Sequence, residues 1–322
     1  MQQNILKFRP YYKSVIWGGD KIASYKGVEI AERCVGESWE LSAVPGHESV
    51  VADGLLAGKN IVELASEYGA ELLGSDVTAR YGKQFPLLVK LIDARSDLSV
   101  QVHPDDRLAQ ERHKSPGKTE MWYVVGRAPG ARIYCGLSAP LTPESYVERV
   151  TSGTIMDVVA AHNSEPGQFF YIPAGTIHAI GAGNFIAEIQ QSSDVTYRVY
   201  DYNRRDAVGH TRQLHTDEAR DAIDYRFPHH VEPTAKRFDR TTAGAVVSPY
   251  FRVDYVGGDT ELTDCGKGKA FTVIMVTGGT ATLTAGDEIA TLPQGSTVLI
   301  PASAPAYTLR TDLRGSALHI KP

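Results

Sequence analysis

The pattern of apolar and polar positions along the chain predicts a mainly β protein. Short runs rich in valine, isoleucine, phenylalanine and tyrosine are bounded by glycine, proline or aspartate, which is typical of strands joined by turns. In the N-terminal part these runs cover residues 85–92, 98–103, 120–125, 131–135, 168–172, 185–190 and 196–202. Helical periodicity is confined to a few segments, so we expect a β-rich core with helical insertions rather than alternating βαβ units.

Three segments have the pattern of helices. Apolar residues recur at helical spacing within residues 60–73, and residues 216–225 form a shorter candidate. Another helix is expected to begin at Pro143, because Thr142 supplies an N-cap hydroxyl and proline is favoured at the first helical position.

The pattern weakens from residue 226 to about residue 246, where the sequence is polar and has little periodicity. This segment is the best candidate for a linker. Beyond it, apolar runs at 271–276, 280–283, 297–300 and 317–320 predict a compact all-β segment. We therefore expect two domains, residues 1–235 with the helical insertions and residues 236–322.

One internal repeat relates the two expected domains. Residues 167–178 and 295–306 share a glycine, a five-residue strand and a Pro-Ala turn at one constant offset. The first copy ends on His178, whereas the second has Ala306 at that position. The second copy thus keeps the framework without the metal-binding side chain, and we place the site chemistry in the first copy.

Composition excludes several classes of protein. The chain has 322 residues, 42% hydrophobic and 22% charged, with a net charge of −5, which is ordinary for a globular protein. The acidic balance argues against a nucleic-acid partner, because phosphate backbones need clustered lysine and arginine. There is no apolar run of about 18 residues for a membrane span. Three scattered cysteines, Cys34, Cys135 and Cys265, fit no disulfide framework and favour a reducing cytoplasm.

Four side chains form a candidate metal site. Gln101 and His103 alternate along one expected strand and so point the same way. Glu120 begins another strand, and His178 follows the Pro-Ala-Gly turn. An amide oxygen, two imidazoles and a carboxylate suit a borderline divalent ion such as Zn²⁺, and the lack of thiolates favours an open position for substrate.

Two other polar groups are explained without a ligand. Asp105, Asp106 and His113 follow a strand-ending proline, and we interpret them as caps or solvated turn residues. His229 and His230 are adjacent in the polar linker, where histidines are usually solvated.

Several motifs, in this order along the chain, resemble those of type I mannose-6-phosphate isomerases of the short bacterial, two-cupin form. They are IWGG at 16–19, GESWELS at 36–42, QVHPDD at 101–106, GKTEMWY at 117–123, YIPAGTIHA at 171–179 and EIQQSSDVTYRVYDY at 188–202. The resemblance implies two cupin (jelly-roll) β-sandwich or barrel domains, with a helical insertion in the first and no metal in the second. It also implies one Zn²⁺ per chain, held by Gln101, His103, Glu120 and His178.

The resemblance further implies the reaction and its residues. The family interconverts mannose 6-phosphate and fructose 6-phosphate through an enediol(ate), and its catalytic arginine matches Arg198. Lys118 matches an active-site lysine, and Glu188 matches an acidic residue that faces the pocket. Either residue is a candidate for the base: Lys118 if burial lowers its pKa, Glu188 if desolvation raises its own.

The expected partner is a small sugar phosphate, with no nucleic acid or membrane, and the expected state is a monomer or weak homo-oligomer. Candidates for binding the phosphate are Arg198, Lys118, Arg204, Arg205, Ser42 and Ser99. Two other functions fit the residues. Two histidines and a carboxylate also resemble the facial triad of an iron oxygenase, which predicts oxygen consumption. A non-catalytic sugar-binding cupin predicts binding without turnover.

Overall fold

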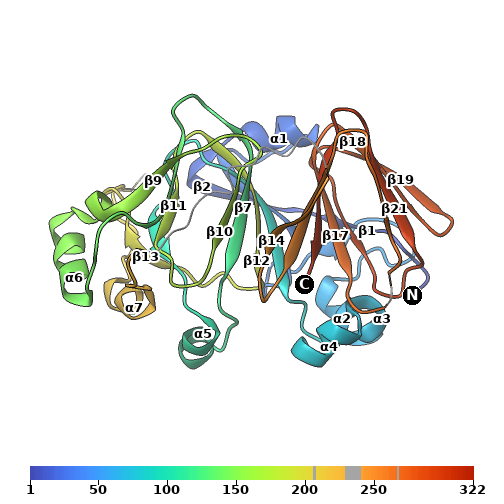
Figure 1. The fold of residues 1–322 in the computed structure, drawn as a ribbon, viewed down its shortest axis with the longest axis horizontal. Helices are drawn as coiled ribbons and strands as arrows, with labels where there is room; N and C mark the ends of the chain where they lie inside the picture. The colour runs from blue at the N-terminus through green and yellow to red at the C-terminus, as the bar shows by residue number, and fades with distance from the viewer. Residues whose placement is uncertain (206–207, 229–240, 267) are drawn as a thin grey trace.

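The computed structural model describes residues 1–205, 208–228, 241–266 and 268–322. The described residues form four antiparallel β-sheets arranged as two halves, one with a six-stranded and a five-stranded sheet, the other with a seven-stranded and a four-stranded sheet (Figure 1). Helices lie at the periphery, with α6 (Pro143–Ser152) and α7 (Thr216–Ala222) at one end and α2 (Ile61–Tyr68), α3 (Ala70–Leu73) and α4 (Ser75–Tyr81) beneath the other half. The expectation of a mainly β, cupin-like fold with helical insertions is confirmed.

The first half contains most of the predicted strands. Its six-stranded sheet has the order β10 (Phe169–Ile172), β7 (Glu120–Arg127), β12 (Asn184–Gln191), β5 (Leu87–Asp93), β3 (Val35–Leu41) and β2 (Tyr11–Gly19). Its five-stranded sheet has the order β13 (Tyr197–Tyr200), β6 (Val100–Val102), β11 (His178–Ile180), β8 (Arg132–Leu137) and β9 (Val159–Asn163). Apolar side chains such as Trp122, Phe170 and Ile180 form a core cluster in this half.

The second half combines both ends of the chain. Its seven-stranded sheet has the order β14 (Thr242–Val247), β15 (Arg252–Gly257), β22 (Ser316–Lys321), β17 (Thr272–Gly278), β20 (Thr297–Ile300), β1 (Leu6–Arg9) and β4 (Val50–Val51). Its four-stranded sheet has the order β16 (Glu261–Asp264), β21 (Tyr307–Thr311), β18 (Thr280–Ala285) and β19 (Glu288–Pro293). β1 pairs with β20, with Leu6 opposite Leu299, so the N-terminal strand belongs to the C-terminal sheet.

The predicted division at residue 235 falls outside the described residues, as do His229 and His230. The two-domain boundary therefore stays a prediction. Since β1 and β4 pair within the C-terminal sheet, the N-terminal segment stabilises both halves.

The helices differ from the sequence expectation at several places. They are α1 (Lys21–Lys26), α2 (Ile61–Tyr68), α3 (Ala70–Leu73), α4 (Ser75–Tyr81), α5 (Asp106–His113), α6 (Pro143–Ser152) and α7 (Thr216–Ala222), with a 3-10 turn η1 (Ile155–Val158). Of these, α1, α4 and α5 were not expected, and α7 ends at Ala222. The single helix expected over 60–73 is broken at Gly69, whose φ of 50° lies outside helical geometry. The expected turn after Asp105 is instead the start of α5, because the Asp105 carboxylate accepts a hydrogen bond from the backbone N–H of Leu108 at 2.8 Å and caps the helix.

The internal repeat has the same backbone geometry in both halves. The N–H of Gly167 donates to the carbonyl of Val124 at 2.8 Å, and the N–H of Gly295 donates to the carbonyl of Val276 at the same distance. The strands β10 and β20 follow these glycines. The structure thus supports a duplicated strand and turn, with His178 beginning β11 in one copy only.

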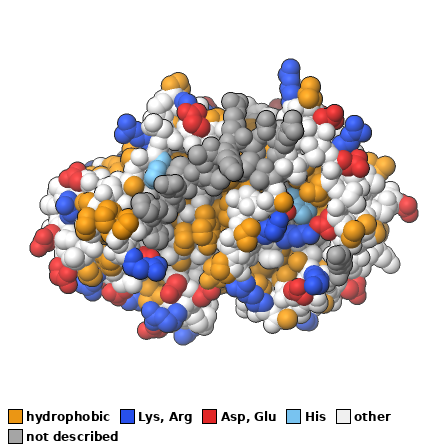
Figure 2. All heavy atoms as spheres, viewed as in Figure 1, with side chains coloured by type: hydrophobic (Ala, Val, Ile, Leu, Met, Phe, Trp, Pro, Cys, Tyr) orange, Lys and Arg blue, Asp and Glu red, His pale blue; other side chains and the backbone are white. Residues whose placement is uncertain are grey.

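No helix among the described residues is both long and apolar enough to cross a membrane. On the face shown in Figure 2, acidic and basic side chains are interspersed with apolar ones.

A polar cluster lies inside the second half. His319 on β22 is 3% exposed, and its Nδ1 and Nε2 lie 3.4 Å and 3.5 Å from carboxylate oxygens of Asp254 and Asp264. The Tyr307 hydroxyl donates to Thr272 and accepts from His319 Nε2 at 2.7 Å. Burial alone would lower the pKa of His319, but the two neighbouring carboxylates outweigh this effect and raise the pKa.

This raised pKa predicts a pH-dependent stability. A group whose folded-state pKa is raised contributes stability that is fully present below its unfolded pKa and is lost as the pH rises through the folded value. We expect H319Q to lower the free energy of unfolding by on the order of 3 kcal/mol at about pH 5.5, and by less at about pH 9. Denaturant unfolding at both pH values measures the difference, and equal losses would contradict a charged His319.

Candidate functional site

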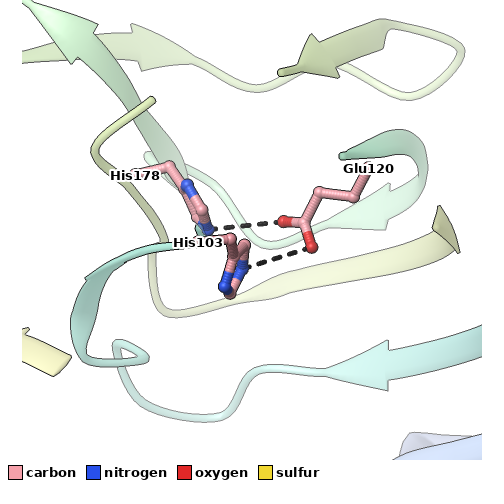
Figure 3. A group of neighbouring side chains, drawn as sticks. All are labelled: His103, Glu120 and His178. Atoms are coloured by element: carbon pink, nitrogen blue, oxygen red, sulfur yellow. Dashed lines mark ion pairs between the residues drawn. The ribbon is translucent and has the colours of Figure 1, made fainter. Parts of the chain in front are cut away.

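Three buried side chains meet between the two sheets of the first half. Glu120 begins β7, His178 begins β11, and His103 follows β6. The three side chains point toward one another (Figure 3). The Glu120 oxygens lie 3.4 Å from His103 Nε2 and 3.3 Å from His178 Nε2. One potential ligand atom from each residue lies within 4.8 Å of the others, so this group has the spacing of a metal site.

The backbone fixes which histidine nitrogen faces the centre. His103 Nδ1 lies 3.0 Å from the carbonyl of Val195, and His178 Nδ1 lies 2.8 Å from the carbonyl of Thr176. A carbonyl only accepts hydrogen bonds, so both Nδ1 atoms carry the proton and both Nε2 atoms offer a lone pair to the centre. Such outer partners orient metal-binding histidines.

Gln101 adds a fourth candidate donor. On β6 it is paired with His178 of β11, and its side-chain amide nitrogen lies 3.3 Å from His178 Nε2. A 180° rotation of the amide presents the oxygen, the ligating atom of glutamine, at the same position. Gln101 therefore lies at the edge of the His103, Glu120 and His178 group.

The donor chemistry fits a divalent metal. Burial lowers the pKa of His103 to about 3 and also lowers that of His178, so both imidazoles are neutral at physiological pH. Burial opposes ionisation of Glu120, but Lys118 and His103 hold the pKa of its carboxyl well below the usual value. Glu120 Oε1 is buried without a hydrogen-bond partner. An orphaned carboxylate oxygen between two neutral imidazoles is the form in which these residues bind a cation.

Lys118 lies directly beside this centre. Its ammonium donates to Glu120 Oε2 at 2.8 Å and to His103 Nε2 at 2.9 Å. Lys118 is 4% exposed, yet it also lines the neighbouring cavity. Its side chain can therefore reach both the metal ligands and a molecule in that cavity.

The cavity has a volume of about 330 Å³, large enough for a small sugar. In the five-stranded sheet, Arg198 of β13 is paired with Gln101 of β6, which is paired with His178 of β11. These three residues therefore lie in one row across the sheet. The cavity is lined by Lys13, Val15, Trp17, Glu37, Trp39, Lys90, Ile92, Leu98, Ser99, Gln101, Lys118, Ile180, Glu188, Asp194, Thr196, Arg198 and Arg212.

Arg198 contributes a positive charge with free hydrogen-bonding capacity. One terminal nitrogen donates to the carbonyl of Gln213 at 2.8 Å, while its Nε is buried without a partner. Burial and the nearby Arg212 lower the pKa of Arg198, although a guanidinium stays protonated in proteins. Arg212 is bound to Asp201, with Nε to Oδ2 at 2.8 Å.

The structure sorts the sequence candidates for phosphate binding. Arg198, Lys118 and Ser99 line the cavity. Ser42 is buried elsewhere, where its hydroxyl accepts from the backbone N–H of Val44. Arg204 bonds to Asp201, and Arg205 donates to the carbonyl of Gly209. Neither arginine is among the described residues that line the cavity.

The sequence analysis missed five charged residues of the cavity: Lys13, Glu37, Lys90, Asp194 and Arg212. A signal was present for two of them. Lys90 interrupts the apolar run of β5 and Glu37 lies within β3, and buried charged residues in strands are rare unless they are paired.

Fold and site together define a class, a mainly β, cupin-like protein with a buried centre of histidine and glutamate that could bind a metal. Comparisons with known proteins specify it further. The sequence profile of the type I phosphomannose isomerase catalytic domain matches residues 5–121. Mannose-6-phosphate isomerase from Streptococcus mutans is 35% identical, over 94% of this chain and 94% of its own. Mannose-6-phosphate isomerase ManA from Bacillus subtilis is 35% identical, over 92% of each chain.

A solved structure supports the same relationship. The mannose 6-phosphate isomerase from Bacillus subtilis superimposes with a TM-score of 0.85 at 32% identity, covering 99% of this chain and 100% of its own. The chain belongs to the type I phosphomannose isomerase family, and the resemblance seen in its motifs is confirmed.

The geometry predicts the effect of removing a metal ligand. Losing a residue that only orients a metal ligand typically weakens metal binding by roughly 10–100-fold. We expect H178A to weaken binding of a divalent ion by more than this, because the variant loses a ligand itself. H162A is the control, since His162 is on β9, the outer strand of the five-stranded sheet, and bonds to a backbone carbonyl rather than to a side chain of the group. Calorimetric titration with the ion measures both, and equal affinities would exclude His178 as a ligand.

Proposed function

We propose that the protein is a zinc-dependent aldose–ketose isomerase that interconverts mannose 6-phosphate and fructose 6-phosphate through an enediol(ate). The names of the similar enzymes support the substrate pair. The observation that carries the proposal is the buried group of His103, Glu120 and His178 beside a sugar-sized cavity that contains Arg198 and Lys118. The protein would act in the cytoplasm, as a monomer or weak homo-oligomer.

The ligands proposed for one Zn²⁺ per chain are Gln101, His103, Glu120 and His178. Nitrogen and oxygen donors without thiolate suit zinc and leave a position for substrate. When bound, the ion would act as a Lewis acid on sugar oxygens. The protein's part is to hold the donors in their ligating forms, neutral histidine and ionised glutamate, and to keep the centre dry.

Arg198 is proposed to stabilise negative charge that develops on the sugar. A proton moves between C2 and C1, and the oxygen beside the reacting carbons becomes an oxyanion. The unpartnered Nε of Arg198 offers a donor from a fixed, planar cation that does not exchange its own proton. Arg198 and Arg212 also give one end of the cavity a positive charge suited to the phosphate.

Lys118 and Glu188 are the two proposed proton-transfer groups, and both line the cavity. Lys118 is tied to Glu120 and His103, next to the sugar oxygens that the metal would hold. Glu188 is on β12, which pairs with β7 in the six-stranded sheet, and Trp122 Nε1 donates to its Oε1 at 2.9 Å. A carboxylate and an ammonium in the same cavity suit a reaction that needs a base at carbon and an acid at oxygen.

Metal dependence tests the zinc proposal. A chelator is expected to abolish isomerisation of mannose 6-phosphate in a coupled assay, and Zn²⁺ is expected to restore it, because the donor set is incomplete as a catalyst without its cation. Full activity in protein shown by elemental analysis to be metal-free would exclude this role. Binding of the sugar phosphate without turnover would instead support a non-catalytic cupin.

Removal of the Arg198 guanidinium tests charge stabilisation. We expect R198A to lower kcat/KM by about 10²–10³-fold, the effect typical of losing one donor to a developing oxyanion, while zinc content stays the same. R226A is the matched control, because Arg226 is an exposed arginine that bonds only to Asp224 in the described part of the chain. A loss of zinc together with activity in R198A would point to a structural role.

Solvent isotope labelling separates the proton-transfer groups. In deuterated water, an exchangeable base is expected to place deuterium at C1 of fructose 6-phosphate, since the abstracted proton mixes with solvent. E188Q is expected to suppress labelling and turnover together if Glu188 is the base, and K118M if Lys118 is. Fast turnover without label would contradict any exchangeable base.

A further inference from the structure

A row of alternating charges crosses the six-stranded sheet on the wall of the cavity. Lys13 of β2 lies 3.7 Å from Glu37 of β3, and Lys90 of β5 lies 3.5 Å from the same carboxylate. Lys90 also lies 3.0 Å from Oε2 of Glu188 on β12. Strand register sets this order, because Lys13 is paired with Glu37 and Lys90 with Glu188. All four residues line the cavity.

Lys90 is the buried centre of this row. Its side chain is 7% exposed and lies over the ring of Trp39, with Nζ 4.9 Å from the ring centroid. Burial alone would lower the pKa of Lys90, but the carboxylates of Glu188 and Glu37 outweigh it and raise the pKa above its usual value. Lys90 is therefore a fixed cation that has two carboxylates as partners.

Glu37 holds Lys90 from the side away from Glu188. The indole N–H of Trp39 donates to Glu37 Oε2 at 2.7 Å. Burial opposes ionisation of Glu37, but Lys90 and Lys13 outweigh this effect and lower its pKa. The charge of Lys118 also lowers the pKa of Glu37. The more distant carboxylate of Glu120 also raises the pKa of Lys90.

Glu188 lies between two partners from its own sheet. Trp122 donates a hydrogen bond to Oε1 at 2.9 Å, and Lys90 forms an ion pair with Oε2 at 3.0 Å. Both partners are the register neighbours of Glu188, on β7 and β5. The charge of the carboxylate is compensated only by Lys90 among the ion pairs of the described residues.

We infer that Lys90 is a positioning residue for the reaction, which holds the Glu188 carboxylate in place in the cavity, and that Glu37 holds Lys90 in place for this task. The inference rests on the proposed isomerase function, in which Glu188 acts on the sugar. Lys90 itself needs no contact with the reacting carbons. Its effect is electrostatic, because a cation within about 4–6 Å favours the charged form of a carboxylate.

The K90M variant tests this role through the pH dependence of kcat/KM. Without the ammonium, the cavity wall loses the central cation of its row of charges, so the acidic limb of the profile is expected to move up by about one pH unit or more. At a pH on that limb, kcat/KM is expected to fall about tenfold. An acidic limb at the wild-type position would overturn the inference.

A matched control removes a different buried lysine. Lys26 lies 2.5 Å from Glu40, another carboxylate of β3, and neither residue lines the cavity. K26M is expected to leave both limbs of the profile in place. A shift in K26M equal to that in K90M would overturn the inference, since it would show a general effect of losing a lysine.

A double-mutant cycle shows whether Lys90 acts through Glu188. In an E188Q background, K90M is expected to change kcat/KM by less than about twofold, because the group that Lys90 positions is gone. A full K90M effect in that background would overturn the inference. If K90M alone does not fold, the double variant K90M/E37Q removes one positive and one negative charge and so restores the charge balance of the wall. The acidic limb of its profile is expected to shift in the same direction as in K90M. An unshifted limb in the double variant would overturn the inference.

These outcomes are distinct from failure of the proposed function. Metal-loaded wild-type protein without isomerase activity would remove the proposed function before any variant is compared. Active wild-type protein with a K90M profile of wild-type shape would overturn the role of Lys90 alone.

Discussion

The structure depends on one constraint: charged side chains that are buried between two sheets must compensate one another. Glu120 is fully buried, and its charge is balanced by Lys118, whereas the two neutral imidazoles present lone pairs to it rather than protons. An isolated carboxylate there would be costly enough to become protonated. A divalent cation resolves the remaining imbalance, because Glu120 Oε1 has no hydrogen-bond partner. Metal binding and compact packing of this half are therefore favoured by the same interaction.

The two sheets supply different parts of the chemistry. One row in the five-stranded sheet carries Arg198, Gln101 and His178, whereas the six-stranded sheet carries the charged wall that includes Lys90 and Glu188. Since side chains alternate along a strand and neighbouring strands are in register, each row presents its groups on one face at fixed spacing. The cavity between the sheets thus has a donor row on one side and an acid–base wall on the other.

The sequence predicted much of this arrangement, for identifiable reasons. Period-two patterning and turn residues located most strands of the first half, and the repeated strand and turn singled out His178 over Ala306. The motifs that resemble the family located Arg198, Lys118 and Glu188. Glu37 and Lys90 were missed because they meet through pairing of β3 with β5, strands separated by three helices in the chain. Local patterns do not reveal such register, and the same holds for the pairing of β1 with β20.

The second half shows what the fold keeps when the metal donors are lost. Its repeat preserves the glycine turn and strand, yet no histidine follows the turn. The half instead buries His319 between two aspartates. Because β1 and β4 complete its seven-stranded sheet, unfolding of this half would release the segment that leads into β2 and β3. Those strands carry Lys13 and Glu37, so the second half stabilises one end of the charged wall on which Lys90 depends.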